Sequence, residues 1–433
     1  MSTKYYNPSG FPENLPGEQI VEEKLKAIIR DTSESFGYVP LETSAVEYLD
    51  TLSSKGEVTK EIYTIGRALD EETSDGDRAL RFDLTVPSAR YVAQHYNELV
   101  FPFKRYQIQR VWRGERPQKG RFREFYQADI DVIANEKLPL ACDAEVATVM
   151  LRILDRFGIG SFTMHLNNRK VLQGILTGCN ISATNAALRI IDKFDKVGRE
   201  KTEGSLVSEC GIDAAIATQV FDLLGEPVAL TDVPAWCVAL PFSNEVLTEG
   251  VAELTAVAAL LAAHANVVFN PRIARGLDYY TGSVFETTLD GFEKYGSICS
   301  GGRYANLTEK FISRTLPGVG LSIGLTRLLD IIKIEQLLPT NRAGVTDVVV
   351  GLANEDVRAE AHALGEELRQ AGLNVEVFYS GDVTLGKQAA FAEKRGAKGL
   401  VFRQTDGSLL IKTSGGQEKS VSVAQILELC NKK

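Results

Sequence analysis

Two features of membrane and exported proteins are missing from this sequence of 433 residues. No apolar run approaches the roughly 18 residues that a bilayer-spanning helix needs. The segment from Met1 to Pro16 is polar and lacks the basic and then apolar pattern of a secretory signal. We therefore expect a cytoplasmic protein.

Cysteine and histidine are scarce, and neither shows the spacing of a metal site. The cysteines contain no Cys-x-x-Cys pair, and the histidines show no ligand spacing. We therefore expect reduced thiols and neither a zinc site nor a disulfide framework. The residues concerned are Cys142, Cys179, Cys210, Cys237, Cys299, Cys430, His95, His165, His264 and His362.

An excess of positive charge is also missing, since the formal net charge is −9. A surface that binds nucleic acid all over is normally positive, so any such contact must be local here. One basic cluster stands out between residues 104 and 123, although clusters of this kind are often only solvated surface. Its members are Lys104, Arg105, Arg110, Arg113, Arg116, Lys119, Arg121 and Arg123.

The basic cluster falls on a predicted β-hairpin. Residues 105–113 and 122–133 both alternate between apolar and polar side chains, which is the period of a half-buried strand. The glycine-bounded segment 114–121 between them predicts a cationic loop. One face of the hairpin is mostly polar and comprises Arg105, Gln107, Gln109, Arg113, Phe125, Gln127, Asp129 and Asp131.

Such a face is either solvent-exposed surface or the floor of a binding site, and the second interpretation is favoured. The planar guanidinium of arginine suits phosphate oxygens, and the ring of Phe125 offers a flat surface for a purine. The carboxylates beside them suit a substrate ammonium group. ATP together with an amino acid would satisfy both halves.

Two motifs in and beyond this region resemble those of class II aminoacyl-tRNA synthetases. Val-Trp-Arg-Gly-Glu at 111–115 with Phe-Arg-Glu-Phe at 122–125 resembles motif 2, which is specific when complete, as here. Residues 318–328 resemble motif 3, a glycine-rich strand followed by a helix that brings an arginine to the nucleotide. The second motif alone would be a weak signal.

Three further segments resemble histidyl-tRNA synthetases and their paralogues. They are Arg-Gly-Leu-Asp-Tyr-Tyr-Thr-Gly at 275–282, Arg-Phe-Asp-Leu-Thr-Val-Pro-Ser-Ala-Arg at 81–90 and Ser-Gly-Gly-Arg-Tyr at 300–304. Taken singly, the first could be a surface turn before a strand at 281–288, and the third could be only a tight turn. Together, and in the family's order, they identify the chain as similar to this family.

The resemblance implies a binding site for histidine. Asp83 would pair with the substrate ammonium, with Thr85 and Gln127 completing its hydrogen bonds, because a charged amine taken out of water needs a partner. Asp131 and Tyr280 would hold the two ring nitrogens of the imidazole. The histidine-binding residues implied are thus Asp83, Thr85, Gln127, Asp131, Tyr279 and Tyr280.

Three of these residues have structural alternatives. Thr85 is equally typical of a helix cap, with Asp83 as an ordinary residue at the end of a strand. The side chain of Tyr279 is also typical of a core residue that packs behind the site.

The resemblance also implies an ATP site. Arg113 would bind the α-phosphate, and Arg275 would bridge that phosphate and the substrate carboxylate; these two are the implied catalytic residues. Positive charge placed around an in-line displacement supplies most of the rate in such reactions. Glu115 would meet the adenine edge and Phe125 its face, while Arg121 and Arg327 would hold the outer phosphates. Mg²⁺ is implied for the pyrophosphate group, with no protein metal ligand assigned.

The implied activity is that of a histidine–tRNA ligase, which forms histidyl-adenylate from L-histidine and ATP and transfers the histidyl group to the 3′ end of tRNA(His). The alternative is a non-catalytic, histidine-sensing paralogue that acts as the regulatory subunit of ATP phosphoribosyltransferase. Such paralogues generally lack the C-terminal domain and lose motif arginines. This chain keeps Arg113, Arg275, Arg327 and residues 345–433, which favours the ligase.

The implied fold class is α+β. A class II catalytic domain over residues 1–332 would be built on a mixed, mainly antiparallel sheet, with a helical insertion at 170–250 and an anticodon-binding α/β domain at 345–433. In the last segment, strands at 348–352, 375–379 and 399–403 alternate with helices at 355–371 and 385–395, which predicts a mostly parallel sheet. Its basic residues Lys387, Lys394, Arg395, Lys398 and Arg403 could contact tRNA phosphates.

A predicted helix at 19–37 and the segment 37–44 resemble motif 1, the dimer interface of class II synthetases, so a homodimer is expected. Two positions depart from the family pattern. Ser44 stands where proline is usual, and Ala305 stands where aspartate is usual.

Overall fold

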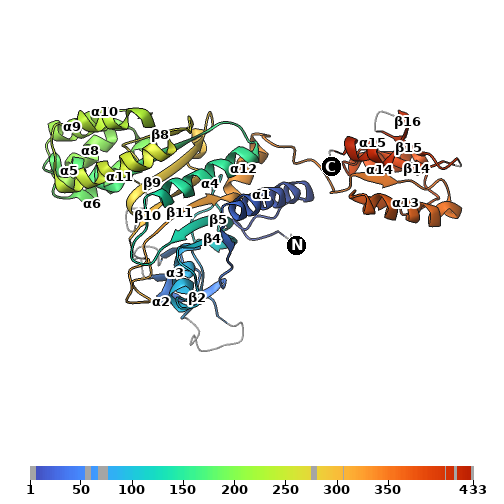
Figure 1. Ribbon diagram of the computed structural model, residues 1–433, viewed down its shortest axis with the longest axis horizontal. Coiled ribbons are helices and arrows are strands. Elements are labelled where there is room, and N and C mark those ends of the chain that lie inside the picture. Colours follow the sequence, from blue (N-terminus) through green and yellow to red (C-terminus); the bar gives the residue numbers. More distant parts are fainter. Residues whose placement is uncertain are drawn as a thin grey trace, which may run out of the picture. The chain divides into compact units, whose positions relative to one another are not determined.

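The computed structural model describes residues 6–53, 60–66, 77–274, 280–305, 307–404, 406–413 and 417–430 (Figure 1). The chain forms two compact units. The larger comprises residues 1–13 and 25–337, and the smaller comprises residues 14–24 and 338–433. Within the ranges given above, no helix combines the length and the apolar character that crossing a membrane requires.

A nine-stranded sheet forms the centre of the larger unit. The pairings from β4 across to β6 are antiparallel, whereas β1 with β4 and β6 with β8 are parallel. The expectation of a mixed, mainly antiparallel sheet is therefore confirmed. In spatial order the strands are β1 (Val39–Pro40), β4 (Phe103–Trp112), β5 (Glu124–Ile133), β11 (Gly318–Gly324), β10 (Cys299–Tyr304), β9 (Tyr280–Leu289), β6 (Phe162–Asn168), β8 (Val267–Phe269) and β7 (Val228–Ala229).

The predicted hairpin consists of β4 and β5. The apolar face of this hairpin includes Tyr106 and Ile130, which are cross-strand partners. Helices α4 (Ala141–Phe157) and α12 (Leu325–Ile334) pack on the central strands and bury an apolar stripe of their own. The polar face is buried as well, since Arg105 is 1 % exposed and Gln107 is 0 % exposed. The interpretation of this face as solvent-exposed surface is therefore wrong at these two residues.

The N-terminal elements border the hairpin. Helix α1 (Pro16–Ser35) begins with a proline, whose missing N–H costs nothing in the first turn. Strand β1 then joins the edge of the sheet beside β4. The Oγ of Ser44 accepts a hydrogen bond from the Val46 N–H at 3.2 Å, a contact that the usual proline could not make. The elements that follow are β2 (Val46–Tyr48), α2 (Leu49–Leu52), β3 (Arg78–Leu80) and α3 (Thr85–Gln94).

Helices occupy residues 169–261, beside β8 and β9 (Figure 1). Helices α5 and α11 lie unusually close, because a Cβ at Gly174 would lie 2.6 Å from the Cα of Leu247, and one at Gly250 would lie 2.6 Å from the backbone nitrogen of Val171. Glycine at these positions lets the two backbones approach. The helices are α5 (Arg169–Gly178), α6 (Thr184–Ile191), α7 (Phe194–Val197), α8 (Arg199–Cys210), α9 (Ala214–Leu224), α10 (Val233–Val238) and α11 (Glu245–Leu261).

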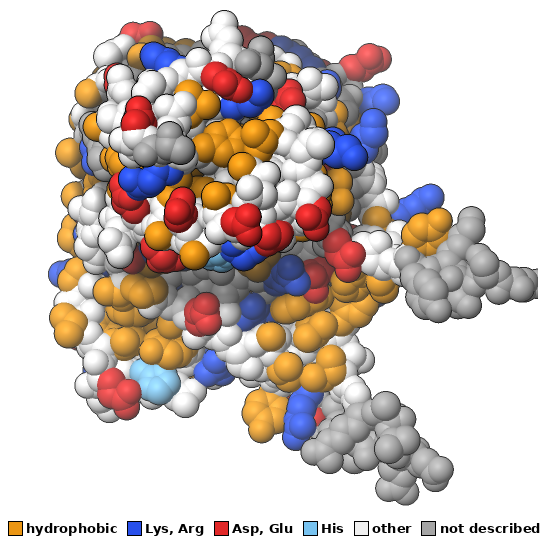
Figure 2. Space-filling model, turned by 90° about the vertical axis from the view of Figure 1, so that its right-hand side faces the viewer, with side chains coloured by type: hydrophobic (Ala, Val, Ile, Leu, Met, Phe, Trp, Pro, Cys, Tyr) orange, Lys and Arg blue, Asp and Glu red, His pale blue; other side chains and the backbone are white. Residues whose placement is uncertain are grey.

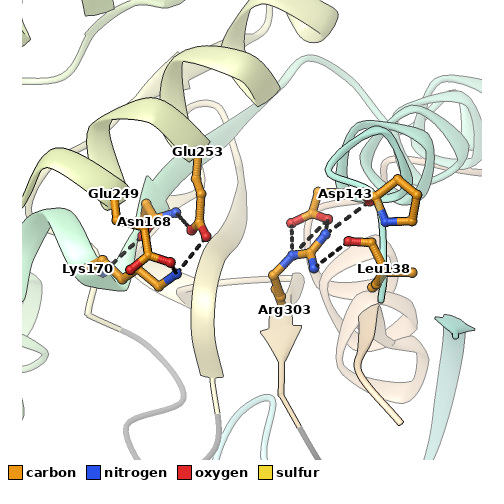
Figure 3. A network of polar contacts seen from close by, with 8 residues as sticks. Leu138, Asp143, Asn168, Lys170, Glu249, Glu253 and Arg303 are labelled. Atoms are coloured by element: carbon orange, nitrogen blue, oxygen red, sulfur yellow. Dashed lines mark hydrogen bonds and ion pairs between the residues drawn. The ribbon is translucent and has the colours of Figure 1, made fainter. Parts of the chain in front are cut away.

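Ion pairs join these helices to the sheet (Figure 3). The Nζ of Lys170 on α5 lies 2.6 Å from Oε1 of both Glu249 and Glu253 on α11. The other oxygen of Glu253, Oε2, accepts a hydrogen bond from the Nδ2 of Asn168 at 2.8 Å. Asn168 is the last residue of β6, so the network fixes α11 against the end of that strand.

A second buried network holds Arg303 on β10 (Figure 3). Its guanidinium bonds both carboxylate oxygens of Asp143 on α4, and its Nη1 donates to the Leu138 carbonyl at 3.0 Å. A Cβ at Gly282 would lie 2.8 Å from the Cδ of Arg303 and 3.4 Å from Oε2 of Glu253. The glycine that ends the 275–282 motif is therefore required by packing between the two networks.

The smaller unit contains a five-stranded sheet. Strands β13 (Val375–Val377), β12 (Val348–Val350) and β14 (Leu400–Arg403) are parallel, as predicted. Strands β15 (Leu409–Lys412) and β16 (Glu418–Val421) add two antiparallel pairings, so the prediction of a mostly parallel sheet is wrong. Its main helices are α13 (Arg358–Gln370), α14 (Leu385–Lys394) and α15 (Val423–Leu429).

The close approach of β10 and β11 predicts the cost of a small substitution. A Cβ at Gly301 would overlap the carbonyl oxygen of Gly320 on the neighbouring strand. Gly301→Ala should therefore lower the free energy of unfolding by about 1–3 kcal/mol in denaturant titrations. Gly204→Ala on α8 is the control, because its Cβ would meet no neighbouring atom and alanine should stabilise the helix by about 0.5–1 kcal/mol. Wild-type stability of Gly301→Ala would contradict the packing described.

Candidate active site

A cavity of about 1320 Å³ lies over the polar face of the central strands. Every predicted site residue that the structure describes lines it. These residues are Asp83, Thr85, Arg113, Glu115, Arg121, Phe125, Gln127, Asp131, Tyr280 and Arg327. Arg275 and Tyr279 lie outside the described residues.

Cross-strand register arranges the floor of the cavity in rows, because directly opposed residues in antiparallel strands point to the same face. Strands β4, β5 and β11 each contribute one position to a row. One row is Arg105, Asp131 and Gly320, and the next is Gln107, Asp129 and Ser322.

Arg105 is the ion-pair partner of Asp131, the predicted imidazole ligand. The Nη2 of Arg105 lies 2.6 Å from Oδ2 of Asp131, and its Nη1 donates to Oε1 of Gln107 at 2.9 Å. Burial raises the pKa of Asp131, and the Arg105 guanidinium opposes that rise. Arg105 therefore stabilises the anionic form of a carboxylate that is 5 % exposed.

Glycines of the motif 3 segment make room for Asp131 and its second partner. A Cβ at Gly320 would overlap Oδ1 of Asp131, and one at Gly318 would overlap the ring of Tyr304. Because Gly318 and Gly320 have no side chains, the Tyr304 ring has room, and its hydroxyl donates a hydrogen bond to Oδ1 of Asp131 at 3.0 Å. The glycine-rich strand therefore fixes the orientation of this carboxylate.

Asp129 is a second buried carboxylate on the floor, 4 % exposed. Its Oδ2 lies 4.0 Å from Nη2 of Arg105. Burial raises the pKa of Asp129 to about 7; Arg105 opposes the rise, and the nearby charge of Asp131 adds to it. Two buried carboxylates thus share one guanidinium, and the closer pairing is with Asp131.

The N-terminus of α3 carries two of the residues assigned to the substrate ammonium. Oδ1 of Asp83 accepts the backbone N–H of Val86 at 2.9 Å. Thr85 is the first helical residue and does not cap it, so the alternative that makes Thr85 the cap is wrong. Both side chains line the cavity.

Arg113 lies between two aromatic rings at the edge of the floor. Its Cζ is 4.4 Å from the ring centroid of Phe82 and 5.1 Å from that of Phe125. Its Nε donates to the Phe82 carbonyl at 3.2 Å. These contacts hold the guanidinium, and no carboxylate among the residues that the structure describes forms an ion pair with it, which keeps its positive charge available to an anion.

The cationic loop is held by weaker contacts. Arg121 and Glu115 form a partly exposed ion pair, with 3.3 Å between Nη1 and Oε2. Such pairs are worth about 0–1 kcal/mol, so phosphate oxygens could replace the carboxylate. The Nε of Arg327 on α12 donates to the Gly120 carbonyl at 2.9 Å, and its Nη1 donates to the Ser297 carbonyl at 3.0 Å. Arg327 thus joins the loop to the helix that follows β11.

Three residues of the floor were given no role from the sequence: Arg105, Asp129 and Tyr304. The alternation of 105–113 and 122–133 places the first two on the polar face, and Tyr304 ends the 300–304 motif. Their mutual contacts depend on strand register, which neither strand reveals by itself. The available signal was the charge of Arg105 and Asp129 on the polar face, together with the position of Arg105 opposite the predicted ligand Asp131.

The described residues contain no group of three or more His, Cys, Asp and Glu side chains arranged to hold a metal ion. Asp131 is instead engaged by Arg105 and Tyr304, and Asp83 by a backbone N–H. The donor set therefore does not fit a metal cage made by protein groups alone in this part of the chain.

Known proteins are similar to this chain in sequence and in architecture. The family Histidyl-tRNA synthetase matches residues 10–328. The chain belongs to this family. A histidine–tRNA ligase of Thermobifida fusca is 45 % identical over 394 residues, which cover 89 % of each chain.

Solved structures agree with the family assignment. The crystal structure of histidyl-tRNA synthetase from Nostoc sp. PCC 7120 has a TM-score of 0.89 and 37 % identity, covering 99 % of this chain and 100 % of that one. A structure described as an ATP phosphoribosyltransferase regulatory subunit/histidyl-tRNA synthetase from Bacillus halodurans has a TM-score of 0.74 at 20 % identity, covering 93 % and 99 %. The latter similarity shows a shared fold only.

Because the charges of the cavity floor are buried, we expect the substitution of Arg105 to lower the stability of the protein to an extent that depends on pH. Arg105→Met leaves Asp129 and Asp131 without their guanidinium, which should lower the free energy of unfolding by about 3–5 kcal/mol at pH 8. Protonation of the two carboxylates removes the negative charge that the guanidinium no longer balances. Because the pKa values of both carboxyls are already raised, the loss in free energy of unfolding should shrink as the pH falls toward 5.

Denaturant titrations at several pH values measure this effect. Arg110→Met is the matched control, because Arg110 lies on the same strand and its ion pair with Glu124 is half exposed. That variant should lose at most about 1 kcal/mol. A deficit in Arg105→Met that does not depend on pH would contradict the electrostatic explanation.

Proposed function

We propose that this chain is a histidine–tRNA ligase that activates L-histidine with ATP and transfers the histidyl group to tRNA(His). The observation that carries the proposal is one cavity in which a buried, carboxylate-rich floor meets a cationic loop, in a member of the histidyl-tRNA synthetase family. A zwitterionic amino acid and a nucleoside triphosphate match these two halves.

The histidine ammonium binds at the N-terminus of α3 and the adjoining part of β5. Asp83 supplies the negative charge, and Thr85 and Gln127 supply further polar contacts. The geometry supports this role, since Oε1 of Gln127 is buried and has no hydrogen-bond partner in the described residues, while its Nε2 donates to Oγ of Ser322 at 3.1 Å. A buried acceptor of this kind needs a donor from a ligand.

The imidazole binds beside Asp131 and Tyr280, and Tyr279 contributes from the neighbouring segment. Asp131 is held anionic by Arg105, so it accepts the ring N–H, and Tyr280 meets the other ring nitrogen. An amino acid without a ring N–H leaves the buried carboxylate without this additional hydrogen bond. In sites of this type that defect can cost a factor of about 10⁴ in catalytic efficiency.

The nucleotide binds over the loop and the first turn of α12. Arg113 binds the α-phosphate, Phe125 stacks on the adenine, and Glu115 meets the adenine edge. Arg121 and Arg327 bind the outer phosphates. The weak ion pair of Arg121 with Glu115 supports this assignment, because phosphate is a stronger ligand for arginine than a partly exposed carboxylate.

The reaction has two steps. A carboxylate oxygen of histidine forms a bond to the α-phosphorus while the bond to pyrophosphate breaks. A hydroxyl of the terminal adenosine of tRNA then attacks the histidyl carbonyl, loses its proton, and releases AMP. Arg113 and Arg275 stabilise the charge that builds on the α-phosphate. No side-chain nucleophile is required.

In this proposal Mg²⁺ binds together with ATP. It typically binds through substrate phosphates with few protein ligands. When bound, it neutralises phosphate charge.

Contacts with tRNA are local in this proposal, and the segment 345–433 is assigned to the anticodon arm and helices 170–250 to the acceptor arm. Figure 2 shows basic and acidic side chains interspersed over one face of the molecule. In the smaller unit, Lys387, Lys394 and Lys398 are exposed. Arg395 and Arg403 form partly exposed ion pairs with Glu376 and Glu367, which phosphates could displace.

We also propose a cytoplasmic homodimer. The motif 1 resemblance supports it, as does the exposure of Val39 (47 %) on the edge strand β1 and of Tyr48 (62 %) on β2. An edge strand with exposed apolar side chains is a ready site for pairing.

Pyrophosphate exchange into ATP, run with each of the twenty amino acids, tests the function. Exchange with histidine alone is expected, followed by charging of tRNA(His). Tight histidine binding without exchange would favour the histidine-sensing regulatory alternative and would contradict the ligase.

Arg275, which lies outside the described residues, should be required for adenylate formation. Arg275→Ala removes the charge that bridges the α-phosphate and the carboxylate, and loss of such a group typically costs about 10²–10³-fold in rate. The single-turnover rate of adenylate formation measures this effect, with Tm and circular dichroism as controls for folding. An unchanged rate would disprove the assigned role.

A further inference from the structure

Asp129 has an unsatisfied oxygen that points to a ligand. Its Oδ1 is buried and has no hydrogen-bond partner in the described residues. Its Oδ2 lies 4.0 Å from the Arg105 Nη2, beyond the roughly 2.7–2.9 Å of a charge-assisted hydrogen bond. A buried carboxylate oxygen without a hydrogen-bond donor is costly, even though Arg105 and the Ser322 hydroxyl act on the same carboxylate. Because Asp129 lines the cavity, a bound molecule can supply the missing donor.

A second unsatisfied oxygen lies beside the first. Oε1 of Gln127 is also buried without a partner in the described residues, and Gln127 lines the same cavity. Positions two apart on a strand face the same side at a spacing of about 6.7 Å. Side chains at that residue spacing can incline toward each other, and one nitrogen can donate hydrogen bonds of about 2.8 Å to both oxygens once they lie within roughly 5.6 Å of each other. A nitrogen with several N–H groups satisfies both oxygens, which an imidazole N–H does not.

The charges of the floor favour a cation at this position. Among the described residues, the titratable or charged groups that act on Asp129 are Arg105, Asp131, Asp83 and the thiol of Cys299. The one guanidinium is committed to Asp131 at 2.6 Å. Asp129 therefore contributes a negative charge that no cation of the described residues neutralises at hydrogen-bond distance.

We propose that Asp129 accepts a hydrogen bond from the α-ammonium group of bound histidine, next to Gln127, and is a further residue that selects the amino acid. This inference rests on the proposed function, because it takes histidine as the ligand. It gives Asp129 a direct contact with the substrate, while Arg105 acts as a positioning residue through Asp131.

The raised pKa of Asp129, about 7, gives the contact a pH dependence. The ammonium binds the ionised carboxylate, so binding is strongest above that pKa and weakens as the pH falls through it. An asparagine at this position cannot titrate. The ratio of wild-type to Asp129→Asn affinity should therefore fall as the pH is lowered from 8 to 6.

The test compares two ligands and two variants of the full chain by isothermal titration calorimetry at pH 8. The ligands are histidine and 3-(imidazol-4-yl)propanoate, which lacks only the amino group. Asp129→Asn should weaken histidine binding by about 10- to 100-fold and leave the des-amino ligand nearly unchanged. Asp131→Asn is the matched control on the same strand face, and it should weaken both ligands because its contact is with the ring.

Two results would overturn the assignment: an Asp129→Asn penalty of the same size for both ligands, or no penalty for histidine. A purely structural role predicts a lower Tm, whereas removing an unpaired buried charge should leave the Tm of the ligand-free protein equal or higher at pH 8. If the asparagine variant does not accumulate, Asp129→Ser carries the same comparison. Wild-type pyrophosphate exchange is measured separately, so failure of the ligase assignment is distinguishable from failure of this contact.

Discussion

The ion pair between Arg105 and Asp131 is the constraint on which the site depends. It is formed by directly opposed residues on β4 and β5 and is almost wholly buried. A slip of one residue in either strand would turn the charge on that strand to the apolar face, where α4 and α12 pack. The ion pair thus penalises a one-residue slip, and the observed register aligns Gln127 and Asp129 along the cavity floor.

The glycines of β10 and β11 belong to the same constraint. At positions 301, 318 and 320 a Cβ would overlap a neighbouring carbonyl, the ring of Tyr304 or the carboxylate of Asp131. The space that these glycines leave is filled by the polar groups that hold Asp131 in place. The packing of the two strands and the orientation of Asp131 therefore depend on the same glycines. A substitution that moves the strands apart would also let the Asp131 carboxylate move.

Much of this arrangement could be predicted from the sequence. The hairpin follows from alternation over 105–133, and the family motifs identify residues that line one cavity. The burial of the polar face could not be predicted, because alternation cannot distinguish a face covered by solvent from one covered by other parts of the chain. Strands β15 and β16 were missed since each has only four residues and β16 is largely polar, so neither shows a clear period. Both Asp83 and Thr85 are capping residue types, and only the observed helix start decides between them.

The two halves of the cavity differ in how their charges are held. The carboxylates of the floor are buried, and Asp131 is fixed by a guanidinium and a hydroxyl, so this half is rigid before any ligand arrives. The arginines of the other half contact aromatic rings, a partly exposed carboxylate and carbonyl oxygens. In the proposed function, this rigid negative half orients the amino acid with its ammonium inward and its carboxylate toward the arginines. The same arginines would bind the nucleotide phosphates, which would bring the carboxylate and the α-phosphate together at the boundary between the two halves.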